Sequence, residues 1–432
     1  MTADAHGTVV VLDDDPTGTQ AVADVPVLFE WERTLLRRVA AGVPALHLLT
    51  NSRAFPADEA YAIVRGAAEA AASALAGARF VLRGDSTLRA HLLEEYRAVR
   101  DAAYPGRFPP LLLVPALPAA GRVTVGGVHL IERDGSRTPL HETEYAADPA
   151  FAYTSAALLR WADERSRGFF RQTDGIEIHL DRLREEGADA VASALAELAR
   201  RGAPAVLAPD AESVADLEVI AAGLEQAEQA DVAVVVRCAP TFAGVISGKL
   251  ARGRVEAPPR GRGLLVVCGS YVPTTSRQLA ALVAAHPGTL VELDVLRLAS
   301  DRPAAEVARA ARAARSALAR TGLAVLATPR ARPAAVADLE AGRRIARNLA
   351  RAAGEAAGAA DVVLAKGGIT SHVTAHEGLA ARFGRVVGPL VDGVALWRLE
   401  VAGRTLPYVV FPGNVGRETT LLEVVDLILG RS

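Results

Sequence analysis

Three carboxylates crowd the first polar turn of the chain. The apolar run Val9–Leu12 is followed directly by Asp13-Asp14-Asp15-Pro16-Thr17-Gly18. Adjacent carboxylates repel and raise each other's pKa, so they are tolerated where water, a cation or a substrate hydroxyl compensates. Asp, Pro and Gly also suit a solvated turn with an Asp helix cap. Three acidic side chains at one strand end favour a functional site.

A second polar loop combines two arginines with hydroxyl side chains. It reads Arg83-Gly84-Asp85-Ser86-Thr87-Leu88-Arg89 and follows the apolar run Phe80–Leu82. Two guanidinium groups beside hydroxyls can hold a small carboxylate bidentately, which Lys cannot do. The alternative is a helix N-cap by Asp85 or Ser86, with both arginines solvated.

Three glycine-containing loops lie in the second half of the chain. They are Cys268-Gly269-Ser270-Tyr271-Val272-Pro273-Thr274-Thr275, Lys366-Gly367-Gly368-Ile369-Thr370-Ser371 and Pro412-Gly413-Asn414-Val415-Gly416. Glycines followed by hydroxyl residues at a helix start let backbone N–H groups approach a phosphate. Each loop alone is also typical of a turn with a cap. Together they predict a phosphate site.

All five loops follow short apolar runs that are predicted to be buried strands. Ala-rich helical stretches such as Ala57–Ala76 separate several of these runs. This alternation predicts an α/β fold of two domains, each with a largely parallel sheet flanked by helices. In such sheets ligands bind outside the C-terminal ends of the strands. The predicted strands include Val9–Leu12, Ala45–Leu49, Phe80–Leu82, Leu111–Val114, Ala205–Leu207, Val232–Val236, Leu264–Val267, Leu323–Ala327, Val362–Leu364 and Pro407–Phe411.

Length also predicts two domains, since 432 residues with 50% hydrophobic content exceed the usual size of one core. The stretch Gly248–Gly263 is rich in Pro, Gly and Arg and lacks apolar periodicity, so we place the boundary there. The expected domains are 1–255 and 256–432. The segment Gly121–Asp148 is expected to be a loop-rich insertion near the site.

Composition argues against several classes of partner. The net charge of −2 arises from 48 basic and 50 acidic residues that are mixed throughout, which indicates neither nucleic acid nor a membrane as partner. No signal peptide or long apolar run is found, and a cytoplasmic location is expected. The two cysteines, Cys238 and Cys268, exclude a disulfide framework and are expected to be buried. There is neither a P-loop motif nor a Gly-x-Gly-x-x-Gly after the first strand.

The ordered set of motifs resembles the four-carbon acid sugar kinase family, which includes 3-oxo-tetronate, threonate and erythronate kinases. The resemblance covers nearly the whole chain. The family's Asp-Asp-x-Thr-Gly motif is matched by Asp14–Gly18, its Asp-Ser-Thr-x-Arg motif by Asp85–Arg89, and its Gly-Gly-x-Thr-Ser motif by Gly367–Ser371. Further matches are Asn51-Ser52-Arg53, Gly269-Ser270 with Thr275 and Gln278, and Gly413-Asn414. Departures at Pro16, Arg83, Ala90 and 239–242 leave the particular sugar acid open.

The resemblance implies phosphoryl transfer from ATP, with Mg²⁺, to a hydroxyl of a small sugar acid held in an interdomain cleft. Asp14 or Asp85 would serve as general base or orient the hydroxyl. The substrate-binding residues would be Asp15, Thr17, Gly18, Arg53, Arg83, Ser86, Thr87 and Arg89, and the nucleotide would contact Ser270, Gly367, Gly368, Ile369, Thr370, Gly413 and Asn414. Ligands for the metal and the oligomeric state, including a homo-oligomer, stay open.

Two other functions compete with a kinase. Asp13-x-Asp15-x-Thr17 also fits an aspartyl-phosphate phosphatase with Asp13 as nucleophile. Such an enzyme needs a Lys beside the phosphoryl group and a later acidic pair for Mg²⁺, and the chain has only Lys249 and Lys366 and no such pair after a strand. The third class is a non-catalytic sugar-acid-binding protein.

Overall fold

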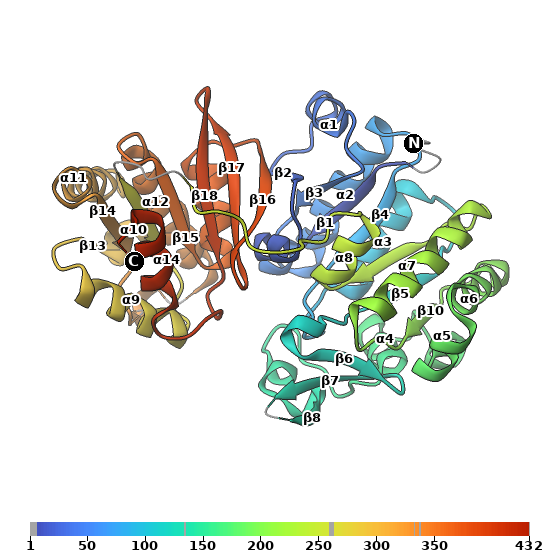
Figure 1. The fold of residues 1–432 in the computed structure, drawn as a ribbon. Coiled ribbons are helices and arrows are strands. Elements are labelled where there is room, and N and C mark those ends of the chain that lie inside the picture. The colour runs from blue at the N-terminus through green and yellow to red at the C-terminus, as the bar shows by residue number, and fades with distance from the viewer. Residues whose placement is uncertain (1–6, 134, 259–262, 332, 337, 432) are drawn as a thin grey trace. The chain divides into compact units, whose positions relative to one another are not determined.

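The computed structural model divides the chain into two compact units, Met1–Leu250 and Ala251–Ser432 (Figure 1). It describes residues 7–431 except 134, 259–262, 332 and 337. Part of the predicted boundary stretch, residues 259–262, therefore lies outside the described residues. Each unit has its own sheet and its own hydrophobic core.

The first unit contains an eight-stranded sheet in which all neighbouring strands are parallel. The strand order is β2-β3-β1-β4-β11-β5-β10-β9. Most of these strands are short apolar segments rich in Val and Leu, as buried parallel strands require. The strands are β1 (Val9–Asp13), β2 (Val25–Leu28), β3 (Ala45–Leu49), β4 (Arg79–Arg83), β5 (Leu111–Val114), β9 (Ile176–Ile178), β10 (Val206–Pro209) and β11 (Val235–Cys238).

Helices cover both faces of this sheet. Val9 and Val11 of β1 belong to a core cluster that includes side chains from α5 to α8. Because side chains alternate along a strand, Val10 and Leu12 point to the opposite face, where both are also buried. The helices of this unit are α1 (Arg33–Ala40), α2 (Ala57–Ala74), α3 (Leu92–Ala103), α4 (Leu158–Ser166), α5 (Leu180–Glu186), α6 (Ala188–Arg201), α7 (Val214–Gln229) and α8 (Pro240–Ile246).

The segment 121–148 differs from its prediction as a loop-rich insertion. It contains a three-stranded antiparallel sheet of β6 (Arg122–Val125), β7 (Val128–Arg133) and β8 (Ser136–Pro139). Gly126 and Gly127 join β6 to β7 with φ values of 60° and 74°, which glycine adopts without strain. The glycines that suggested a loop are thus the turn of a β-hairpin.

The second unit has a seven-stranded sheet of mixed direction, in the order β13-β14-β12-β15-β18-β17-β16. The first four neighbouring pairs are parallel and the last two are antiparallel. The strands are β12 (Leu264–Cys268), β13 (Leu290–Glu292), β14 (Leu323–Ala327), β15 (Val362–Lys366), β16 (Phe383–Val391), β17 (Val394–Val401) and β18 (Arg404–Phe411), and the helices are α9 (Pro273–Ala285), α10 (Val295–Ala299), α11 (Ala304–Thr321), α12 (Leu339–Ala357), α13 (Gly368–Val373) and α14 (Thr420–Leu429).

The predicted fold class is confirmed, although the sequence reasoning missed β16 and β17. In the structure β16 alternates buried and more exposed residues along its whole length, but its sequence carries two glycines and a proline, and β17 begins with four buried residues in a row. Apolar content alone therefore does not show where β16 and β17 begin and end, or that they run antiparallel to β18. Cys238 and Cys268 are both free and buried, as predicted. No described helix is long and apolar enough to span a bilayer.

Candidate functional site

In the first unit, strand register gathers the polar loops at one edge of the sheet. Asp13 at the end of β1 pairs with Arg83 at the end of β4, and Arg83 pairs with Cys238 at the end of β11. The loops that follow these strands therefore begin side by side. This is the carboxyl edge of the sheet, where the sequence placed the site.

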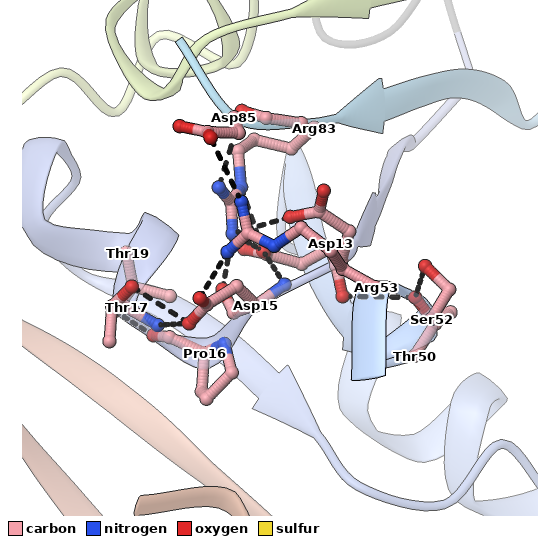
Figure 2. A network of polar contacts seen from close by, with 12 residues as sticks. Asp13, Asp15, Pro16, Thr17, Thr19, Thr50, Ser52, Arg53, Arg83 and Asp85 are labelled. Atoms are coloured by element: carbon pink, nitrogen blue, oxygen red, sulfur yellow. Dashed lines mark hydrogen bonds and ion pairs between the residues drawn. The ribbon is translucent and has the colours of Figure 1, made fainter. Parts of the chain in front are cut away.

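Asp13 and Arg83 form a buried ion pair at this edge (Figure 2). Their side chains are 0% and 4% exposed, and Arg83 Nε donates to Asp13 Oδ1 over 2.7 Å. The other carboxylate oxygen of Asp13 lies 3.0 Å from His47 Nδ1. A Cβ atom at Gly18 would overlap the Arg83 guanidinium, so only glycine leaves room for it there. Asp13 and Arg83 thus satisfy each other instead of facing outward.

Arg53 joins the first two acidic loops. Its Nη2 contacts Asp15 Oδ2, and its Nη1 lies 3.5 Å from Asp85 Oδ2. Asp15 Oδ1 accepts hydrogen bonds from Thr17 N and Thr17 Oγ1 at 2.8 and 2.7 Å. Burial raises the pKa of Asp15, but the positive charges of Arg53 and Arg83 outweigh this effect and bring the pKa below its ordinary value.

Asp85 is held by the arginine at the end of its own loop. Arg89 Nε donates to Asp85 Oδ2 over 2.7 Å, and Arg89 Nη1 lies 3.4 Å from Asp148 Oδ2. Burial raises the pKa of Asp85, but Arg53 and Arg89 outweigh that effect and lower the pKa to about 2. Ser86 and Thr87 between them are buried, and the Arg89 side chain stays 28% exposed.

Asp14 is the exception in this network. It is 2% exposed, and neither of its carboxylate oxygens has a hydrogen-bond partner among the described residues. The nearest cations are Arg83 Nη2, 3.3 Å from Oδ1, and Arg237 Nη2, 4.0 Å from Oδ2. Burial raises the pKa of Asp14 to about 6, against the lowering effect of Arg53 and Arg83. A carboxylate of this kind is able to exchange a proton near neutral pH.

The sequence reasoning missed Arg237 and Glu95, which complete the charge network. Arg237 Nη1 contacts Glu95 Oε2, and Glu95 Oε1 accepts from Ser52 Oγ over 2.6 Å. Both charged residues are almost fully buried. A signal existed for each: Arg237 sits in an apolar strand, and Glu95 shares the buried face of α3 with Leu92 and Val99. A charge on an apolar face is a functional candidate in its own right.

In the second unit, register again aligns the ends of the strands. Cys268 of β12 pairs with Lys366 of β15, and Lys366 pairs with Phe411 of β18. The three glycine loops consequently meet. A Cβ at Gly367 would lie 3.0 Å from Ser270 Cβ, and a Cβ at Gly413 would lie 2.9 Å from Ser270 Oγ. Ser270, Gly367 and Gly413 are therefore neighbours.

Side chains beneath these loops tie them together. Thr275 Oγ1 donates to the carbonyl of Gly413 over 2.7 Å, and Gln278 Nε2 donates to Val415 O and Arg417 O at 3.0 and 2.7 Å. The fully buried Lys366 donates from Nζ to Pro412 O over 2.5 Å and lies 3.8 Å from the centre of the Phe411 ring. These bonds fix the loop backbone through its carbonyl groups, and the Gly367 N–H donates to Phe411 O over 2.8 Å.

Gly367 is the glycine whose conformation matters most. Its φ is 112°, which side chains rarely adopt, whereas Gly368 begins α13 and has no positive φ. Gly269 is confined by contact, because a Cβ there would lie 2.7 Å from Thr370 Oγ1. Ile369 and Asn414 are exposed. Either the backbone or the side chain of these two residues is therefore accessible to a ligand at the loops.

Comparison with known proteins identifies both halves. A profile for the sugar-binding N-terminal domain matches residues 9–246, and one for the nucleotide-binding C-terminal domain matches residues 265–421. A D-erythronate kinase of Heliobacterium modesticaldum is 28% identical over 66% of this chain and 63% of its own length. A D-threonate kinase of Salmonella typhimurium is 27% identical over 69% of this chain and 66% of its own. The matched part is just under two thirds of each relative.

A solved structure extends the likeness to the whole fold. A Haemophilus influenzae protein superposes with a TM-score of 0.66 at 18% identity, covering 97% of this chain and 100% of its own. At that identity the match speaks for the fold. The two profiles together span most of the chain, in the order that its motifs predicted. The chain belongs to the four-carbon acid sugar kinase family.

Proposed function

We propose that this protein is an ATP-dependent kinase that phosphorylates a hydroxyl of a small sugar acid, a four-carbon acid such as a 3-oxo-tetronate, threonate or erythronate. Domain 1–255 binds the acid and domain 256–432 binds the nucleotide. Support comes from the two relatives named D-erythronate kinase and D-threonate kinase. The charged edge of the first sheet and the glycine loops of the second suit these two ligands.

The observation that carries the proposal is the buried, unbonded carboxylate of Asp14. Phosphoryl transfer depends on positioning and charge neutralisation, with an acidic residue that orients the hydroxyl and accepts its proton. Asp14 has a pKa of about 6 and two oxygens without hydrogen bonds among the described residues. Asp85, with a pKa of about 2 and a bond to Arg89, is a weaker base. We therefore assign the base to Asp14 and a structural role to Asp85.

The carboxylate of the acid has two candidate partners with exposed area. Arg53 and Arg89 are 19% and 28% exposed at their side chains, whereas Arg83 is 4% exposed and occupied by Asp13. Planar guanidinium groups bind carboxylates in a forked geometry. We propose Arg53 and Arg89 as the carboxylate clamp, with Asp15, Thr17, Gly18, Ser86 and Thr87 shaping the loops around it.

The nucleotide phosphates would lie against the converging loops at Ser270, Gly367–Thr370 and Gly413. The backbone N–H groups that face them would exclude that of Gly367, which donates to Phe411 O. Mg²⁺ would arrive with those phosphates and offset their charge. Among the residues that the structure describes, no group of three or more His, Cys, Asp or Glu side chains is placed to hold a metal ion. Protein ligands for Mg²⁺ are accordingly not assigned.

The environment of Asp13 argues against the phosphatase alternative. A nucleophilic aspartate needs a free carboxylate oxygen facing the substrate. Asp13 is fully buried, one oxygen bonds to Arg83, and the other lies beside His47. This side chain has a structural role in holding β1, β3 and β4 together.

The direct test is ADP release by the full-length protein with ATP and Mg²⁺ and a panel of four- to six-carbon sugar acids. We expect turnover that depends on the added acid, with D-erythronate and D-threonate among the first to be tried. Hydrolysis of aryl phosphates that disappears in Asp13→Asn would support the phosphatase instead. Tight binding of an acid without any ADP release, with ATP bound, would support a non-catalytic binding protein.

A further inference from the structure

A small cavity opens beside the end of β11 in the first unit. It has a volume of about 10 Å³, room for roughly one water-sized group. Its lining includes Asp85 and Leu88 of the second polar loop, Trp161 of α4 and Arg237 of β11. None of the motifs recognised in the sequence includes Trp161 or Arg237.

Two hydrogen-bond donors on residues that line this cavity lack acceptors. Arg237 Nη2 and Trp161 Nε1 are buried, and neither has a hydrogen-bond partner in the described part of the chain. Arg237 is 3% exposed and Trp161 is 1% exposed. A buried donor without a partner destabilises the folded state, and more so when it is charged. Such groups are retained where a ligand or an ordered water completes them.

The Arg237 guanidinium is held so that one end stays available. Glu95 binds its Nη1, and the Glu95 carboxylate is itself fixed by Ser52. A Cβ atom at Gly84 would overlap Nη2, so the glycine of the second polar loop lets this nitrogen pack closely against it. The second guanidinium nitrogen is therefore held in a fixed place on a residue that lines the cavity together with Gly84.

A carboxylate oxygen of Asp14 lies near this nitrogen. Asp14 Oδ2 lies 4.0 Å from Arg237 Nη2, too far for a hydrogen bond, and neither atom has a hydrogen-bond partner among the residues that the structure describes. An oxygen atom at about 2.8 Å from each would bridge that gap. The bridging group must accept from Arg237 and donate to Asp14. A hydroxyl does both, whereas a carboxylate only accepts and would add a negative charge beside Asp14 and Asp85.

We propose that Arg237 and Trp161, together with Asp14, form the subsite for a hydroxyl of the sugar acid. The hydroxyl oxygen accepts from Arg237 Nη2, and its proton is donated to Asp14. Trp161 Nε1 supplies a second donor from the cavity wall, to the same oxygen or to its neighbour on the acid. Arg237 thereby positions the oxygen that Asp14 deprotonates. This inference rests on the proposed function and adds the residues that select the hydroxyl.

The test measures hydroxyl-dependent binding by calorimetry on the full-length protein. Wild type, Arg237→Gln, Arg237→Lys and Trp161→Phe are each titrated with D-erythronate, D-threonate and their 2-, 3- and 4-deoxy analogues, without nucleotide. Arg79→Gln is the matched control, since Arg79 lies at the opposite end of β4 and pairs with Glu228. Folding of every variant is checked by thermal unfolding and by ADP binding, which is expected to involve the other unit.

One deoxy analogue should bind wild type about 10- to 100-fold more weakly than its parent acid, the range for losing a hydrogen bond to a charged donor. In Arg237→Gln the parent acid and that analogue should bind with equal affinity. In Trp161→Phe the affinity difference between the two ligands should shrink less, and in Arg79→Gln it should stay as in wild type. If the acids bind and every analogue keeps its wild-type penalty in Arg237→Gln, Arg237 is merely structural and the inference is wrong. If wild-type protein binds ADP but none of the acids, the proposed function is wrong, and the proposed subsite is wrong with it.

Trp161→Phe keeps the test decisive if Arg237→Gln does not fold. Phe retains most of the volume of the indole ring and removes only the Nε1 donor. We expect this variant to weaken the parent acid and to leave the deoxy analogue unchanged. Equal weakening of both ligands would point to altered packing and would contradict a donor role for Trp161.

Discussion

The carboxyl edges of the two sheets differ in what lies at them: charged side chains at the first edge and glycine backbone at the second. At the first edge, side chains dominate: Asp13, Asp14, Arg83 and Arg237 are all buried and charged. At the second edge, the loops that follow β12, β15 and β18 present glycine backbone. Lys366 is the one Lys, Arg, Asp or Glu inside the three glycine motifs, and burial lowers its pKa to about 7. The first arrangement suits the hydroxyl and carboxylate groups of the proposed sugar acid, and the second suits the phosphate groups of the proposed nucleotide.

This difference also predicts how each edge tolerates change. A buried charge network loses function when one member changes, because its partners are left unsatisfied. A backbone cradle tolerates many side-chain changes but fails where a glycine has a positive φ or a close neighbour. Three predictions separate the two cases, in order of decreasing effect.

Replacement of the proposed base should have the largest effect. Asp14→Asn should lower kcat by roughly 10² to 10⁴ while the acid still binds, since the amide cannot accept the proton. Asp85→Asn should mainly raise the KM for the acid, because Asp85 positions Arg89 and Arg53. Steady-state kinetics with varied acid at saturating ATP distinguishes them. If both variants keep near-normal kcat, neither residue is the base.

A side chain added at Gly367, in the proposed phosphate-binding backbone of the glycine loops, should have the second largest effect. Gly367→Ala forces a φ of 112° on alanine and brings its Cβ to 3.0 Å from Ser270, so the KM for ATP should rise about 10- to 100-fold. The KM for the acid should stay as it is. Gly358→Ala serves as control, because nothing lies within 4 Å of its added Cβ. An unchanged KM for ATP in folded Gly367→Ala would contradict the phosphate cradle.

The pH dependence of Asp14 should give the smallest effect. Its folded-state pKa of about 6 lies above the ordinary 3.8, so between these pH values the folded state binds more protons than the unfolded chain. Asp14 therefore lowers the free energy of unfolding as the pH rises through this window. Asp14→Asn should be more stable than wild type at pH 7 by about 1 to 2 kcal/mol, given about 1.4 kcal/mol per pKa unit and the loss of a countercharge for Arg83.

Denaturant unfolding of both proteins at pH 4 and pH 7 measures this difference. The advantage of Asp14→Asn should vanish near pH 4, where Asp14 is protonated in the folded state. In the same window, kcat/KM of wild type should fall below pH 6 as the base is protonated. A stability difference that does not change between pH 4 and pH 7 would show that Asp14 does not titrate there.

The sequence predicted the fold class and the loops because both depend on local patterns. Apolar runs identified most parallel strands, and the polar residues at their ends marked the edges of the sheets. The antiparallel strands β16 and β17 and the hairpin of β6 and β7 were missed, because their apolar residues and glycines resemble those of other elements. The clustering of Ser270 with Gly367 and Gly413 follows from parallel register once the strands are known.

Residue types and their order along the chain were enough to establish the family and the two polar edges, because motifs and apolar runs are properties of neighbouring residues. The division of labour among the carboxylates could come only from the tertiary structure. Asp13, Asp14 and Asp15 are adjacent in sequence, yet their carboxylates differ. That of Asp13 is neutralised by Arg83, that of Asp14 is buried with no hydrogen-bond partner in the described part of the chain, and that of Asp15 is held by Arg53. Those partners lie 38 or more positions away, and a pKa is determined by the charges and burial around a group in space.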